Sequence, residues 1–221
     1  QAGGLLAAIA TLPDLGAIAA DATVDGPLTA LATTLAVSAG PLRANANGTI
    51  DSQALTGDLR VSATAPAMTP RPDLGWRGVT LDARVTGPLM APEGTGTLSV
   101  DALTAGGATL KALRAGFTGN AGQVDIKAKL DGLALPGPAP DLLAGAPLDA
   151  GLTARMTEPG RPVRFSISHT LLSADGSART EGDLKANVTL RIPELAPFAA
   201  VGGVDVKGRT ELTIDVARAG A

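Results

Sequence analysis

Alternation of apolar and polar side chains is the feature that most constrains how this chain can fold. In residues 184–192 every second side chain, from Leu184 to Ile192, is apolar, and those between are polar or charged. Only a β-strand places two such sets on opposite faces, because its side-chain period is two. Pro193 cannot donate to a sheet ladder, so we predict that the strand ends at Ile192. An apolar plug at 193–201 and strands at 204–208 and 211–216 are expected to follow.

The same alternation recurs along most of the chain and predicts an all-β protein. Roughly a dozen short strands are separated by turn signals about every 8 to 12 residues. No long amphipathic helix lies between them, which argues against a parallel sheet with crossover helices. Local signals predict a short helix within 5–19, a tight turn at Asn47–Gly48, a bulge in 110–117 where the alternation slips, and one helical turn at 141–144.

A repeat of about 60 residues becomes visible when glycine-marked strand ends are aligned. The motif Val24-Asp-Gly-Pro-Leu28 recurs as Val85-Thr-Gly-Pro-Leu89, 61 residues later, with weaker echoes at Gly151 and Gly208. A single unit cannot cover its own apolar face, so neighbouring units must stack. We therefore predict that 1–221 is one elongated segment of a longer protein, with repeat units at roughly 20–84, 85–147, 148–205 and, in part, 206–221.

Composition argues against several classes of function. The chain has no cysteine and a net charge of −3 with both signs interspersed, so we expect no disulfide framework and no binding of nucleic acid. No basic run matches anionic lipid head groups, and no apolar run approaches the roughly 20 residues that span a bilayer. Aromatic residues make up only 2% of the chain, so its apolar surface is built from Ala, Leu, Val and Ile.

The residues that could carry chemistry favour turns and surface positions over catalysis. The single histidine, His169, lies at a predicted strand end, and no nucleophile, zinc or phosphate-loop motif occurs. The acidic run 175–183 is similar to a calcium loop, but Arg179 stands at a ligand position, so a polar hairpin turn is expected. Gly94 and Gly96 likewise predict a turn. We therefore expect no enzyme activity, no metal and no cofactor.

Several segments together resemble the TamB family and its AsmA-like relatives. One is 192–214, which reads as a strand end, an apolar plug, a glycine pair and an alternating strand. The others are the two Val-x-Gly-Pro-Leu copies, the proline-rich loop 135–145 and the run 171–182 before the next strand. This likeness covers most of the chain, and it is one of pattern, without a catalytic fingerprint.

The resemblance implies a non-enzymatic segment of a very long bacterial protein that crosses the periplasm and is anchored in the inner membrane outside this segment. Its repeated antiparallel sheet would fold into an open hydrophobic groove, a β-taco, with short apolar plugs or helical turns between repeats. The family is linked to phospholipid transport between the inner and outer membranes and to outer-membrane protein and autotransporter assembly. Its partner is the outer-membrane barrel TamA, which we expect to bind through another segment.

The candidate site is collective, because it consists of the apolar faces of the strands. From alternation alone this surface could close on itself as a dry core. The scarcity of aromatic residues and the many alanines favour a groove that accepts phospholipid acyl chains, gaining about 0.8 kcal/mol per buried CH₂. With the strands in register, this surface would contain Val61, Leu81, Val85, Leu98, Val100, Val124, Ile126, Leu130, Phe165, Ile167, Val188, Leu190, Ile192, Leu212 and Ile214.

Two other functions remain open from the sequence. A purely structural β-solenoid of a secreted adhesin-like protein would also alternate, although such solenoids have repeats of about 20 to 30 residues. A carbohydrate-active enzyme would need a pair of carboxylates in a cleft and aromatic sugar platforms, and neither is evident. The segment is also expected to expose unpaired sheet edges through which copies self-associate.

Overall fold

One antiparallel sheet makes up nearly all of the structure, a computed structural model that describes residues 18–181 and 184–218. The predicted all-β class is confirmed, and the predicted helix within 5–19 lies outside the described residues except for Ile18 and Ala19, which begin the first strand. The strands are β1 (Ile18–Asp25), β2 (Leu31–Ala39), β3 (Leu42–Asp51), β4 (Thr56–Ala65), β5 (Met68–Arg71), β6 (Leu74–Trp76), β7 (Gly78–Pro88), β8 (Glu93–Ala105), β9 (Ala108–Gly119), β10 (Gln123–Asp131), β11 (Leu148–Arg155), β12 (Pro162–Ser168), β13 (Ser173–Arg179), β14 (Leu184–Ile192) and β15 (Thr210–Arg218).

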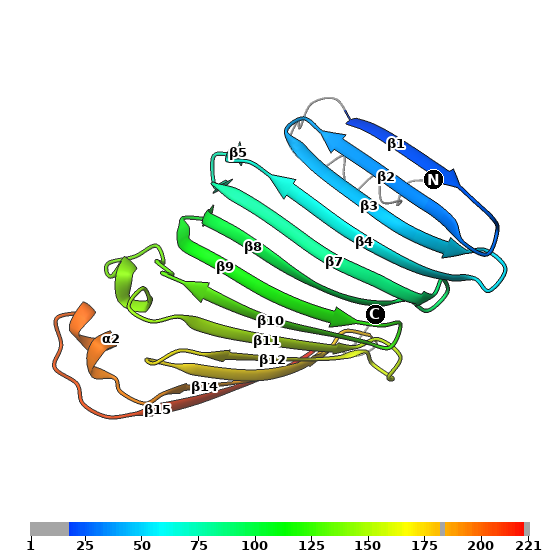
Figure 1. Cartoon of the computed structure of the whole chain (residues 1–221). Helices are drawn as coiled ribbons and strands as arrows, with labels where there is room; N and C mark the ends of the chain where they lie inside the picture. Colours follow the sequence, from blue (N-terminus) through cyan, green and yellow to red (C-terminus); the bar gives the residue numbers. More distant parts are fainter. Residues whose placement is uncertain (1–17, 182–183, 219–221) are drawn as a thin grey trace.

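The strands follow one another across the sheet in chain order, so each pairs with its sequence neighbours. The path runs β1-β2-β3-β4-β7-β8-β9-β10-β11-β12-β13-β14-β15, and the small hairpin of β5 and β6 lies beside it, with β6 pairing to β8. Figure 1 shows an elongated, twisted sheet with β1 at one end and β15 at the other. The sheet does not close on itself, which confirms the predicted open, elongated architecture.

The two rims of the sheet carry different connections. The short-turn rim holds only brief links, such as 26–30, 52–55, 89–92 and 120–122. The insertion rim holds three long insertions, at 66–77, 132–147 and 193–209, together with tight turns. In Figure 1, β5 and the helix α2 (Ala196–Val201) lie along this same side of the sheet.

Each long insertion follows four strands of the path, which divides the sheet into groups at 18–77, 78–147 and 148–209. The predicted unit boundary after 147 coincides with the start of β11, whereas the boundaries predicted after 84 and 205 fall inside β7 and inside the third insertion. The two Val-x-Gly-Pro-Leu copies occupy equivalent places, where the first strand of a group reaches the short-turn rim. Gly26 and Gly87 there have φ angles of 109° and 96°, which glycine adopts without strain.

The insertions contain the short apolar elements that the sequence predicts. The helical turn expected at 141–144 is present as η1 (Pro140–Leu143), and the plug expected at 193–201 contains α2. Leu143 of η1 is buried, with 8% of its surface exposed. An apolar cavity of about 320 Å³ lies between η1, its proline-rich approach, Leu172 and the α2 residues Phe198 and Val201.

The turn predicted at Asn47–Gly48 is wrong, because β3 runs straight through this dipeptide. The chain turns earlier, at Gly40–Pro41, where Gly40 has a φ of 56° and Ala39 pairs with Leu42. A positive φ followed by proline fits a type II′ turn, which matches the twist of the flanking strands. Gly48 instead allows close contact between strands, since a Cβ there would lie 1.9 Å from the Asp58 carbonyl oxygen.

Other local predictions also need correction. Gly94 and Gly96 do not form a turn but lie inside β8. Of the run 175–183, predicted as a hairpin turn, Asp175 to Arg179 belong to β13, and β13 pairs with β14 as a hairpin connected after Arg179. The strand predicted at 204–208 is absent, because this segment is irregular. The Gly208 carbonyl accepts a hydrogen bond from the Leu195 N–H at 2.8 Å, so the segment folds back on the plug.

The slip of alternation in 110–117 is present, but it is not a bulge. Leu110 and Leu113 are both half-buried, whereas Lys111 and Arg114 are exposed. The ladder between β8 and β9 keeps one register on both sides of the slip. On the neighbouring strand β8, Ala102 has a left-handed backbone with a φ of 49°, and the slip occurs without an extra residue in either strand.

Candidate functional site

The register of the strands joins apolar side chains into rows that cross the whole sheet. Residues that pair directly across antiparallel strands lie on the same face. One row contains a single residue from every strand of the path, and none of its members is polar: Ala22, Leu35, Ala46, Val61, Ala83, Gly96, Phe117, Ile126, Leu152, Phe165, Gly176, Val188 and Ile214.

A parallel row two residues along the strands is also entirely apolar. It runs through Ala20, Val37, Ala44, Ala63, Leu81, Leu98, Ala115, Ala128, Ala150, Ile167, Ala174, Leu190 and Leu212. These two rows and their apolar neighbours on the same side are called the apolar face. Alternation in each strand and apolar pairing between strands together produce this continuous surface.

All fifteen side chains of the predicted site fall on the apolar face. Ten belong to the two rows, and Val85, Val100, Val124, Leu130 and Ile192 lie beside them at the same strand parity. Val100 is buried, most of the others are half-buried, and Leu212 and Ile214 on the terminal strand are 50% and 48% exposed. The structure therefore brings the whole set onto one surface.

The prediction omitted several members of this surface. They include Leu35, Val37, Leu59, Leu113, Phe117, Leu148, Leu152, Val163 and Val216. Their strands alternate in the same way, so the period-two signal was available for them. Phe117 was obscured by the slip of alternation, because the half-buried Leu110 and Leu113 of the same strand are three residues apart and so break the period of two.

The apolar face does not close on itself as a dry core. Among the described residues only Val100, Leu143, Leu148 and Ala174 are buried, and no large side chain is fully enclosed. The accessible surface is 13985 Å², whereas a compact protein of this mass exposes about 9,300 Å². The chain thus exposes roughly half as much surface again as a globular protein, and the alternative of a closed interior is wrong.

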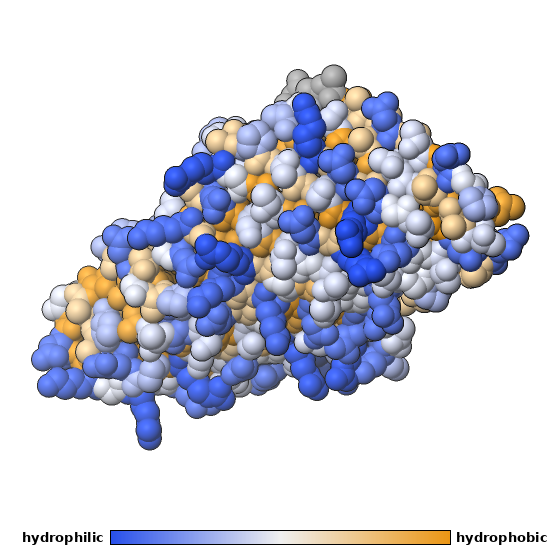
Figure 2. Space-filling model, viewed as in Figure 1, coloured by the Kyte–Doolittle hydropathy of each residue, from blue (hydrophilic) through white to orange (hydrophobic). Residues whose placement is uncertain are grey.

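The opposite face of the sheet is polar and is held by ion pairs between strands. Arg84 forms a two-pronged contact with Asp58, and Arg191 contacts Asp175 and Glu211. The Arg84 guanidinium donates to Asp58 and holds the pKa of this carboxyl below its ordinary value, although burial opposes the shift. Figure 2 shows hydrophilic side chains across the viewed surface, with apolar patches between them and towards the end where α2 lies.

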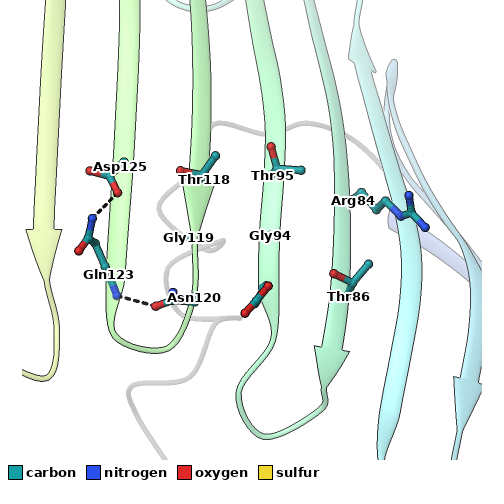
Figure 3. Close-up of a pocket in the computed structure, with 10 residues that line it drawn as sticks. Arg84, Thr86, Gly94, Thr95, Thr118, Gly119, Asn120, Gln123 and Asp125 are labelled. Carbon is teal, nitrogen blue, oxygen red and sulfur yellow. Dashed lines mark hydrogen bonds between the residues drawn. The ribbon is translucent and has the colours of Figure 1, made fainter.

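A hollow of about 450 Å³ lies in this polar face and is lined by Arg84, Thr95, Thr118, Gln123 and Asp125 among others. Figure 3 shows how these residues lie on their strands. Two of its charged groups, Arg84 and Asp125, are engaged within the protein. Hydrogen bonds from Thr153 and Gln123 lower the pKa of Asp125, and Arg84 is held by Asp58.

His169 directly follows β12, at the strand end that the sequence predicts. Its Nδ1 accepts a hydrogen bond from the Leu171 N–H at 3.1 Å, which places the proton of the neutral ring on Nε2. Nε2 is buried and has no partner among the described residues. The ring therefore serves the turn between β12 and β13.

The described residues contain no cluster of three or more His, Asp or Glu side chains that could hold a metal ion. In the same part of the chain, no helix has the length and apolarity needed to cross a membrane. No protein-family model, curated protein or solved structure gives a significant match to this chain. The apolar face is therefore the candidate site on physical grounds alone.

Proposed function

We propose that this chain is a non-enzymatic segment of a TamB-like, AsmA-like periplasmic protein, and that its apolar face carries phospholipid acyl chains between the inner and outer membranes. One observation supports the proposal above all: two rows of apolar side chains cross all thirteen strands of the path without a polar member. The role would serve outer-membrane biogenesis, including the assembly of autotransporters, with TamA as the partner of another segment of the protein.

The chemistry of the face suits a hydrocarbon that moves. Burial of an acyl chain gains about 0.8 kcal/mol per CH₂ group and needs no directional contact. A polar side chain in the rows would hold a lipid at one position, and the rows have none. The many alanines and glycines leave shallow space between larger side chains such as Phe117 and Phe165. A lipid could therefore slide from strand to strand at nearly constant free energy.

The ends of the sheet agree with a segment that continues a longer surface. The apolar side chains of the terminal strands are well exposed, at 59% for Val24 on β1 and 50% for Val216 on β15. Neither strand has a partner on its outer side among the described residues. Further strands at these edges would extend both apolar rows, as a path between two membranes requires.

Native mass spectrometry with lipid extraction tests the proposal on the 221-residue chain expressed in a bacterial periplasm. The variants are Ile126→Asp and Leu190→Asp, each of which places a charge in one apolar row. The matched controls are Lys127→Asp and Thr189→Asp, one residue away on the polar face. We expect bound phospholipid in the wild type and in both controls, and its loss from both row variants.

The outcomes separate the two non-enzymatic functions. Lipid lost only from the row variants supports acyl-chain binding on the apolar face. A folded wild-type protein without lipid, or equal lipid in all five proteins, overturns the proposal and favours the purely structural solenoid. Circular dichroism of each variant establishes that the sheet is intact, so a loss of lipid is not mistaken for unfolding.

A further inference from the structure

Three cationic side chains border one hollow in the polar face near the short-turn rim, between β12 and β15. The hollow has a volume of about 430 Å³, and Arg164, Arg179 and Lys185 line it together with Ser177 and Asp215. Within residues 18–181 and 184–218, no carboxylate forms an ion pair with any of the three cations. Among the described residues the lining thus holds three cations that are not ion-paired and one carboxylate, Asp215.

The register of the strands forces these cations together. Arg179 on β13 pairs directly with Lys185 on β14, and Arg164 on β12 pairs with Ser177, two residues before Arg179. Direct partners have Cβ atoms about 5 Å apart and diagonal partners about 7–8 Å. Like charges directly opposite one another destabilise a strand pair. An anion between them would convert this repulsion into attraction.

Cations also lie directly opposite one another elsewhere on the polar face, at Arg60–Arg84 and Arg114–Lys129, but there one arginine of each pair contacts a carboxylate. Arg84, Arg114, Arg155, Arg161 and Arg191 each contact a carboxylate. The single carboxylate of the hollow, Asp215, accepts a hydrogen bond from Asn187 Nδ2 at 2.8 Å. It is thus engaged with an amide, and three cations face one carboxylate in the lining.

We propose that this hollow binds a phosphate-type anion. Two planar guanidinium groups match the oxygens of a phosphate, and such charge-assisted hydrogen bonds are about twice as strong as neutral ones. The Ser177 hydroxyl supplies one more donor in the lining. The site lies on the opposite face from the apolar rows, so it is separate from the acyl-chain surface. Its ligand is either free phosphate or the phosphate of a lipid head group.

The test uses the full chain and two phosphate sources. Isothermal titration with inorganic phosphate, at low salt in a phosphate-free buffer, measures the free anion. Flotation with vesicles of phosphatidylglycerol, compared with phosphatidylcholine alone, measures an anionic lipid surface. The variants are Arg164→Gln/Arg179→Gln and, separately, Lys185→Gln. The control is Lys127→Gln/Lys129→Gln, which removes two cations of the same face on β10, outside the hollow.

We expect the double arginine variant to weaken binding about ten-fold or more, Lys185→Gln to weaken it less, and the control to bind as the wild type does. Loss in the titration assigns free phosphate, and loss in flotation alone assigns the head group. Absence of saturable binding to both sources, or equal binding by the arginine variant and the control, overturns the proposal. Ile126→Asp should keep phosphate binding while it loses acyl chains, so the two proposals fail independently.

Discussion

Phe165 on β12 lies directly opposite Gly176 on β13, and its ring occupies the space that a side chain at Gly176 would take. A Cβ added at Gly176 would come within 2.3 Å of the ring. The same relationship joins Phe117 to Gly96, where the added Cβ would lie 2.4 Å from the ring. Two of the three phenylalanines thus cover a glycine of the neighbouring strand. Their rings occupy the parts of the apolar face that the glycines leave without a side chain.

This pairing predicts that Gly176→Ala destabilises the sheet, because the methyl group overlaps the Phe165 ring and approaches the Asn187 carbonyl oxygen. We expect a loss of about 1–3 kcal/mol in the free energy of unfolding, measured by urea denaturation. Gly116→Ala is the matched control, since the nearest atom to its added Cβ is 4.0 Å away. Equal unfolding midpoints for the two variants would contradict the overlap.

The ion pair between Asp58 and Arg84 predicts a specific dependence of stability on pH. The Arg84 guanidinium donates hydrogen bonds to the Asp58 carboxylate, and this lowers the pKa of Asp58 in the folded state. The stabilisation is therefore complete above the unfolded-state pKa of about 3.9 and is lost as the pH falls through the lower folded-state pKa. As the pH falls below about 4, the free energy of unfolding should therefore decrease less in Asp58→Asn and in Arg84→Gln than in the wild type. An unchanged acid slope of urea midpoints in both variants would be evidence against this role.

The plug around η1 predicts unequal effects of two leucines that line the same cavity. Leu143 is 8% exposed and Leu135 is 43% exposed. Leu143→Ala should reduce the free energy of unfolding by about 2–5 kcal/mol, because it leaves a void, whereas Leu135→Ala should change it by about 0.5 kcal/mol or less. Thermal and urea unfolding followed by circular dichroism measures both. Similar losses for the two would show that η1 does not pack as described.

The uncovered terminal strands predict concentration-dependent self-association. The path has thirteen alternating strands, so β1 and β15 run in the same direction. An antiparallel joint that keeps both apolar faces on one side must therefore pair β15 with β15, or β1 with β1, about a two-fold axis. Sedimentation velocity should show oligomers that Ile214→Lys on β15 and Ala22→Lys on β1 reduce.

A control separates association through the edges from association through the apolar face. Ile126→Lys places the same charge in the same row, but on a central strand. If edges join the copies, this variant should still associate, while the two edge variants do not. Loss of oligomers in Ile126→Lys alone would assign the contact to the apolar face instead.

The sequence was sufficient to predict most of the strands and the face on which their apolar side chains gather, although it failed for β13 and for 204–208. Period two determines which residues share a side, so Ile126 and Leu190 could be placed together without knowledge of the register. The plug and the helical turn at η1 were also predictable, because proline and short apolar runs are local signals. The spacing of these insertions along the chain also indicates where each group of four strands ends.

Two of the errors concern glycines whose role depends on a contact with the neighbouring strand of the sheet. Asn47–Gly48 has the sequence of a tight turn, but Gly48 is required by the approach of the Asp58 carbonyl from β4. Gly96 also has a turn-like setting, and only its pairing with Phe117 explains it. Local sequence does not contain such cross-strand contacts, so a mid-strand glycine and a turn glycine look alike.

The grouping of strands in fours has a consequence for how such a sheet can vary in length. An even number of antiparallel strands returns the chain to the rim from which it started, so every insertion emerges on the same side as the one before it. Whole groups can thus be gained or lost while the plugs stay aligned along one rim. Deletion of a single strand would send all later plugs to the opposite rim, which makes strand parity a constraint that individual substitutions do not reveal.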